Sequence, residues 1–151
     1  MQKFKDFNDR EWTIDLNIAS AREIRRRMAT IDSLKDVDFL DHSSMLMALN
    51  DVFFAADLLF LVCEKQANER GIDDESFGRS LRGDVLFDAV AAFVAEYVDF
   101  FPDPTIREKI RIVAEKNREL QARLYDAIAK VTDDTIEKIL DDAETKSGAQ
   151  F

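Results

Sequence analysis

The chain has 151 residues, 46% of them hydrophobic, and a formal net charge of −10. This length suits one domain with its own core, and this apolar fraction excludes an intrinsically disordered chain. Residues 31–101 carry fifteen acidic and five basic side chains, a balance that disfavours nucleic-acid binding, which needs a concentrated basic face.

The single cysteine and the N-terminal segment indicate the cellular compartment in which the protein is expected. The single cysteine, Cys63, cannot form a disulfide within the chain, so nothing indicates an oxidising compartment. The opening segment MQKFKDFNDREW lacks the apolar run of a signal peptide. We therefore expect a cytoplasmic protein.

Residues 3–18 predict a small β-hairpin. In WTIDLNI, large apolar residues from Trp12 to Ile18 alternate with polar ones, which is typical of a half-buried strand. Asn8 and Asp9 before it suit a tight turn. A lone hairpin is marginal in water, so its apolar face must rest on other elements.

A helix is expected from Ala21 to about Thr30. Ser20 and Glu23 have the spacing of a capping box, in which each side chain accepts the other's free backbone N–H. Four arginines follow on the face opposite the apolar stripe. We interpret them as a solvated helix face rather than a phosphate site: Arg22, Arg25, Arg26 and Arg27.

Residues 45–63, MLMALNDVFFAADLLFLVC, predict one long apolar helix. Asn50, Asp51 and Asp57 argue against a membrane span, because each aspartate costs roughly 2.5 to 3.5 kcal/mol to insert. We therefore predict a central buried helix. Its apolar residues extend around most of its circumference, so its own domain or a partner must cover the surplus, which includes Phe54, Leu58 and Leu61.

The segment 71–84, GIDDESFGRSLRGD, is predicted to connect helices rather than to form a site. Its glycines and acids do not have the spacing of a calcium-binding loop or a phosphate-binding loop. Gly71 would end the central helix, and Asp73 or Asp74 would cap a short helix through Ser80. Phe77 is expected to be buried.

Two further helices follow. Residues 84–101 form a strongly apolar helix that Pro102 ends, and Asp103 with Pro104 suits the start of the next. In that next helix, apolar residues step by four and three from residue 106 to residue 131, with an asparagine among them. The seam is typical of coiled coils, but it also suits a helix packed on its own domain: Ile106, Ile110, Val113, Asn117, Leu120, Leu124, Ala127 and Val131.

These elements predict a mainly α fold of the α+β type. It consists of a bundle of about five to six helices with a small N-terminal β-hairpin and a long C-terminal helix. Residues 1–131 are expected to form one domain. Residues 132–151 are expected to add a short acidic helix and a frayed end.

The residues do not predict an enzyme. His42 is the only histidine, so a Cys-His couple would need Cys63, about 30 Å further along the same predicted helix. The Glu-x-x-His spacing of di-iron bundles is missing as well. We expect no catalytic residue, cofactor, metal, nucleic acid or membrane. The expected function is to bind proteins through Phe54, Leu58 and Leu61 and through the seam residues Ile110, Val113, Asn117, Leu120 and Leu124.

Three segments give the chain a resemblance to the tail assembly chaperones of long-tailed bacteriophages and prophages. FNDREWTIDLNI resembles their opening strand pair, and SAREIRRRM resembles the capped helix that follows. CEKQANERGI, ESFGRSLRGD and DFFP resemble their later helix, turn and helix. The resemblance covers about residues 4–102 and leaves the seam unmatched.

The resemblance implies a non-enzymatic function in the host cytoplasm. Such a chaperone coats the long hydrophobic tape measure protein, keeps it soluble and recruits tail tube subunits around it. Phe54, Leu58 and Leu61 would then hold the client. The alternative is a self-associating scaffold or adaptor that forms homo-oligomers through the C-terminal seam.

Overall fold

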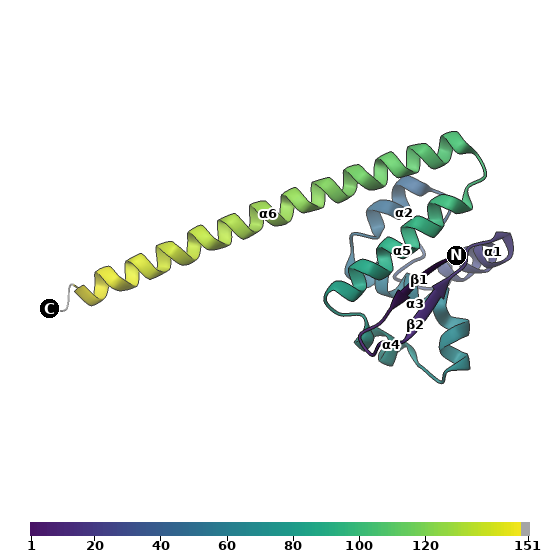
Figure 1. Cartoon of the computed structure of the whole chain (residues 1–151), viewed down its shortest axis with the longest axis horizontal. Helices are drawn as coiled ribbons and strands as arrows, with labels where there is room; N and C mark the ends of the chain where they lie inside the picture. The colour runs from purple at the N-terminus through teal and green to yellow at the C-terminus, as the bar shows by residue number, and fades with distance from the viewer. Residues whose placement is uncertain (149–151) are drawn as a thin grey trace. The chain divides into compact units, whose positions relative to one another are not determined.

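The computed structural model describes residues 1–148, which fall into two units, residues 1–114 and the described part of 115–151. Helices make up 71% of the structure, which confirms the predicted mainly α fold with an N-terminal hairpin and a long C-terminal helix (Figure 1). The elements are β1 (Gln2–Lys5), β2 (Glu11–Ile14), α1 (Ile18–Met28), α2 (His42–Ala48), α3 (Val52–Glu69), α4 (Asp74–Ser80), α5 (Asp84–Phe100) and α6 (Pro104–Gly148).

The predicted hairpin is present, with a shorter second strand. β1 and β2 pair antiparallel, with Phe4 opposite Trp12. Asp9 in the turn has a φ of 63°, in the left-handed region where aspartate is enriched. The strand ends at Ile14, because the chain turns into α1 at Ile18 and exposes that side chain, which was expected to belong to the strand.

The hairpin rests on the helices of its own unit. The side chains of Trp12 and Ile14 are fully buried, and Trp12 meets Phe77 of α4 edge to face with ring centroids 5.0 Å apart. The Gln66 side chain of α3 acts like a further strand residue. Its Nε2 donates to the Thr13 carbonyl at 2.7 Å, and its Oε1 accepts from the Thr13 N–H at 3.0 Å.

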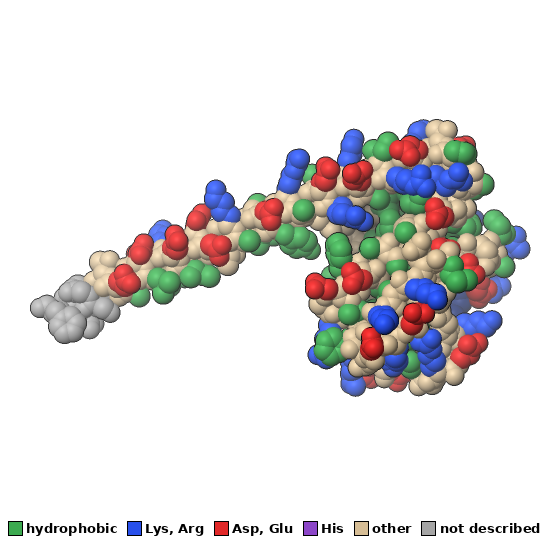
Figure 2. All heavy atoms as spheres, in the orientation of Figure 1, with side chains coloured by type: hydrophobic (Ala, Val, Ile, Leu, Met, Phe, Trp, Pro, Cys, Tyr) green, Lys and Arg blue, Asp and Glu red, His purple; other side chains and the backbone are tan. Residues whose placement is uncertain are grey.

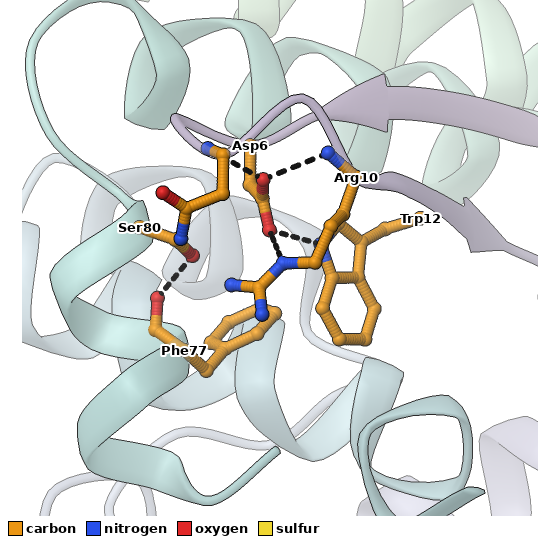
Figure 3. A network of polar contacts seen from close by, with 6 residues as sticks. Asp6, Arg10, Trp12, Phe77 and Ser80 are labelled. Atoms are coloured by element: carbon orange, nitrogen blue, oxygen red, sulfur yellow. Dashed lines mark hydrogen bonds and ion pairs between the residues drawn. The ribbon is translucent and has the colours of Figure 1, made fainter. Parts of the chain in front are cut away.

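A buried carboxylate, that of Asp6, holds the hairpin turn together (Figure 3). Its Oδ1 accepts from the backbone N–H groups of Asn8 and Arg10, at 2.9 and 3.0 Å. Its Oδ2 accepts from Arg10 Nε at 2.7 Å and from Trp12 Nε1 at 2.9 Å. These donors and the arginine charge offset the free-energy cost of burying an ionised group.

The Asp6 network also ties the turn to α4. The Phe7 N–H donates to the Ser80 carbonyl at 2.9 Å, and Ser80 Oγ donates to the Phe77 carbonyl at 2.6 Å. Burial acts to raise the pKa of Asp6, but the hydrogen bonds from Trp12 and Arg10 outweigh it and hold the pKa below its ordinary value. Asp6 is therefore ionised in the folded protein at neutral pH.

The start of α1 differs from the prediction. Asn17 is the N-cap: its side chain accepts from the Ser20 N–H at 2.9 Å, and Ser20 Oγ accepts from the Asn17 N–H at 2.9 Å. Ser20 is thus the third residue of the helix, and the predicted box of Ser20 with Glu23 is wrong. The earlier start places Ala21 in the first two turns of the helix, where it is buried.

Three arginines of α1 form ion pairs. Arg25 Nε lies 3.2 Å from Asp38 Oδ1, and Arg27 Nη1 lies 2.8 Å from Glu64 Oε2 of α3. Arg26 pairs with Glu23 on the same helix. Neighbouring carboxylates thus neutralise much of the arginine cluster, as suits a solvated helix face.

The predicted central helix over 45–63 is two helices. The chain bends by 113° between α2 and α3, and Asp51 caps α3 by accepting from the N–H groups of Phe53 and Phe54. Aspartate is a favourable N-cap, so a polar pair inside an apolar run became a helix boundary. Asp41 caps α2 by accepting from the Ser44 N–H.

The connector after α3 follows the prediction closely. Gly71 has a φ of 67°, the left-handed conformation that ends many helices. Asp73 caps α4 by accepting from the Ser76 N–H at 2.7 Å, and Phe77 is buried. Gly83 rather than Asp84 is the N-cap of α5, and it makes no side-chain cap bond.

The core of the first unit contains an aromatic cluster around α5. Tyr97 is fully buried and donates its hydroxyl proton to the Phe39 carbonyl at 2.6 Å. Its ring stacks on Phe93 and meets Phe39 and Phe101 edge to face. These contacts hold the loop between α1 and α2 onto α5. Burial raises the pKa of Tyr97, so its hydroxyl stays protonated and can donate.

α6 runs without a break through the predicted boundary at residue 131. The Asp103 side chain accepts from the Thr105 N–H at 2.8 Å, as predicted for the start of this helix. The separate acidic helix after Val131 is wrong, since no glycine or proline interrupts residues 132–147, and Thr135 Oγ1 bonds within the helix to the Val131 carbonyl at 2.8 Å. The predicted domain end also moves, from residue 131 to residue 114. Of the predicted frayed end, residues 149–151 lie outside the described part.

Candidate protein-binding surface

The three α3 residues predicted to bind a client are buried in their own domain. Phe54, Leu58 and Leu61 are 6%, 0% and 7% exposed, and all three belong to the core of the first unit. The structure therefore does not expose these three residues as an accessible docking surface. α3 is apolar around most of its circumference because the hairpin, α1, α4 and α5 all pack against it.

The seam of α6 divides into two parts with different surroundings. Ile110 is fully buried, and Ile106 and Val113 pack against the core of the first unit. Ile110 and Val113, which were predicted to bind a partner, thus pack against their own domain in this structure. This part of the seam behaves as the packing alternative predicted.

The second part of the seam is exposed. Asn117 is half-buried, Leu120 is 63% exposed and Leu124 is 58% exposed. From residue 122 to residue 146 every side chain of α6 is exposed. Leu120 and Leu124 are thus the predicted site residues that the structure leaves accessible to a partner.

Further large apolar side chains continue this surface. We define the α6 stripe as six exposed apolar residues that follow one another by three to five positions from Leu120 to Ile139. All six are at least half exposed: Leu120, Leu124, Ile128, Val131, Ile136 and Ile139. Figure 2 shows apolar side chains along one edge of this part of α6 and charged side chains along the opposite edge.

Three members of the α6 stripe were missed in the sequence. Ile128 lies beside the seam position Ala127, and Ile136 and Ile139 fell in the segment interpreted as a separate acidic helix. The missing stop signal between Val131 and Ile136 could have revealed them, because an uninterrupted helix would have joined both segments into one apolar stripe.

A smaller apolar surface lies where α2 and α3 meet. Met47 is 71% exposed and Phe53 is 77% exposed, and Val52 between them is also exposed. Met47 lies in the last turn of α2, and Val52 and Phe53 are the first two residues of α3, so they flank the Asp51 cap. They do not form a run along a helix face of the kind seen on α6.

Cys63 and His42, the residues considered for a Cys-His couple, lie against the core of the first unit. Cys63 is fully buried, and burial raises the pKa of its thiol to about 12. His42, which is half-buried, is the first residue of α2, where its ring meets Phe101 edge to face. At neutral pH the Cys63 thiol is protonated and is therefore a poor nucleophile.

In residues 1–148, histidine, cysteine, aspartate and glutamate side chains form no group of three or more that could hold a metal ion. No single helix there is long and apolar enough to cross a membrane; α2 and α3 reach this composition only together, across their 113° bend.

Comparison with models of known families, with curated protein sequences and with solved structures found no match.

Replacing Leu58 with alanine should distinguish a core residue from a docking residue. We expect Leu58→Ala to lower the free energy of unfolding by about 2–5 kcal/mol, because the side chain is fully buried and its removal leaves a cavity. Phe53→Ala, on the same helix but 77% exposed, is the matched control and should change stability by less than about 1 kcal/mol. Urea denaturation measures both; equal effects would contradict the assignment.

Cys63 should resist thiol reagents in the native protein. With its pKa raised to about 12 and its side chain fully buried, we expect labelling by a maleimide at neutral pH to proceed only when the protein opens. Mass spectrometry should detect at least an order of magnitude slower labelling than in urea, where the pKa returns to about 8.5. Rapid native labelling would show that α3 is less well covered.

Proposed function

We propose that this chain is a non-enzymatic protein-binding module whose binding surface is the α6 stripe. The observation that carries the proposal is the exposure of six large apolar side chains along one uninterrupted helix. Runs of exposed apolar surface of this length are typical of interaction sites in soluble proteins, because water contact with them is unfavourable.

The chemistry of the stripe suits a helical partner. Charged residues lie between the stripe residues in the sequence and on the opposite side of the helix, so this part of α6 has one apolar and one charged face (Figure 2). Such a face binds an apolar stripe on another helix by interdigitating side chains. The partner we propose is therefore an amphipathic helix rather than an extended peptide or a small molecule.

A more specific form of the proposal rests on the resemblance to phage tail assembly chaperones. In this form the client is the long helical tape measure protein, and tail tube subunits are recruited to the complex. The client contact lies on the α6 stripe instead of Phe54, Leu58 and Leu61. The six acidic side chains of residues 132–146 would keep the complex soluble.

Co-expression with a tape measure protein from the same gene cluster tests this form. We expect the wild-type chain to raise the soluble fraction of the client and to co-purify with it, measured by quantitative blotting of soluble and pelleted fractions. The matched comparison is a chain ending at residue 114, which retains the core of the first unit and lacks the stripe. Equal client solubility with both chains would refute the proposed surface.

A second candidate function is a self-associating scaffold or adaptor. The observation that favours it is that the same stripe offers two copies of the chain identical apolar faces. A dimer would bury them without any client. The mass of the purified chain in solution tests this candidate, since a monomer at every concentration would exclude it.

A further inference from the structure

Charge is distributed unevenly along the exposed part of α6. Residues 115–131 carry four basic and three acidic side chains, whereas residues 132–146 carry six acidic and two basic ones. The stripe crosses both segments, with Leu120 and Leu124 in the first and Ile136 and Ile139 in the second. α6 therefore consists of a weakly positive segment followed by a strongly negative one, and the apolar stripe runs along both.

This distribution distinguishes the two ways in which a pair of such helices can run. A parallel pair would place the two negative segments side by side, where like charges repel across the interface. An antiparallel pair places each negative segment beside the weakly positive segment of the other helix. Charge therefore favours the antiparallel arrangement.

We propose that the α6 stripe is covered by the α6 stripe of a second copy of this chain, running antiparallel. The apolar residues match this arrangement, because the stripe is centred between Ala129 and Lys130 and each half of one stripe then meets the opposite half of the other. From Leu120 to Ile139 the stripe spans about 28 Å of helix. The pairing deepens the second candidate function and rests on the stripe being a protein-binding surface.

Spin-label distances between copies test the direction of the pair. Three exposed alanines of α6 lie outside the stripe, so Ala122→Cys, Ala129→Cys and Ala143→Cys place labels without removing an apolar contact. The native Cys63 is fully buried, and the labelled wild-type chain is the control for it. Pulsed electron resonance on each singly labelled full-length variant then gives one distance between copies.

The two directions predict different patterns. In a parallel pair the three distances are nearly equal. In an antiparallel pair, shifting the label by one residue changes the axial offset between the two equivalent labels by twice the helical rise per residue. Seven residues therefore change this offset by about 21 Å. No antiparallel register makes all three distances equal, and the pattern also gives the register. Equal distances, or a monomer at the concentrations used for spectroscopy, would overturn the inference.

A charge variant provides a second test with opposite expected signs. Asp133→Asn with Asp141→Asn removes two charges from the negative segment. We expect the dissociation constant of the dimer to rise roughly threefold, because an attraction is lost, whereas a parallel pair would tighten as repulsion is relieved. Asp15→Asn with Asp88→Asn, two exposed acids of the first unit, is the control for net charge.

The two proposals fail in distinguishable ways. If the chain dimerises antiparallel but does not raise client solubility, the chaperone form fails and the pairing stands. If the chain is monomeric and still keeps the client soluble through the stripe, the pairing is refuted and the client-binding function stands.

Discussion

Replacing Asp6 with alanine should lower the free energy of unfolding of the first unit by about 3–5 kcal/mol, among the largest effects of any single substitution in this chain. The carboxylate is buried and accepts from two backbone N–H groups and from the side chains of Arg10 and Trp12. Its removal leaves the buried Trp12 N–H and the partly buried Arg10 guanidinium without their acceptor. Urea denaturation monitored by Trp12 fluorescence measures the loss.

Two comparisons isolate the cause. Asp15→Ala removes an exposed carboxylate close by in the sequence and should leave the unfolding midpoint nearly unchanged. Asp6→Asn keeps one acceptor oxygen and removes the charge, so its effect should lie between those of wild type and Asp6→Ala. If Asp6→Ala were as stable as Asp15→Ala, the hairpin turn would not depend on this network.

Acid should weaken the same network in the unmodified protein. The pKa of Asp6 is lower in the folded chain than in the unfolded one, where it is about 3.9. The contribution of the ionised carboxylate is therefore complete above that pH and is lost as the pH falls through the folded pKa. The stability difference between wild type and Asp6→Asn should accordingly shrink below about pH 4.

The second large effect is expected for partner binding. Leu124→Gln combined with Ile139→Gln places one polar side chain in each half of the α6 stripe, while glutamine keeps good helix propensity. We expect the double variant to bind its partner, whether client or second copy, at least about thirtyfold more weakly, equivalent to about 2 kcal/mol. Sedimentation measures self-association, and co-purification measures client binding.

The control for this variant places the same new residue at exposed positions of α6 outside the stripe. Ala122→Gln with Ala143→Gln leaves the stripe and every charge unchanged and should bind as wild type does. Both double variants should retain the thermal midpoint of the first unit, because their substitutions lie beyond residue 114. Equal binding by the two variants would show that the stripe is not the binding surface.

Local signals in the sequence predicted several helix boundaries correctly. Gly71 and Asp73 act through conformational preferences and cap bonds that depend on a few neighbouring residues, and so do Asp103 and Pro104. These predictions succeeded because the interactions lie within one turn of chain. The same reasoning failed at Ser20, where Asn17 competed for the cap position, and at Asp51, a capping aspartate inside an apolar run.

The candidate surface was harder to predict, because periodicity shows that a face is apolar but does not show what covers it. Phe54, Leu58 and Leu61 have the same pattern whether a client or their own domain buries them. Ile110 and Leu124 likewise occupy equivalent seam positions, yet one is fully buried and the other is 58% exposed.

The sequence by itself determined the helical class, the N-terminal hairpin and the apolar period of α6, because these depend on backbone preferences and on spacing along the chain. Only the tertiary structure decided that α3 is largely covered by its own domain and that the longest run of accessible apolar side chains lies beyond residue 114. Burial is set by residues distant in the sequence: Thr13 meets Gln66, Phe39 meets Tyr97 and Arg27 meets Glu64. No local pattern specifies such contacts, so the location of the binding surface had to come from the packed chain.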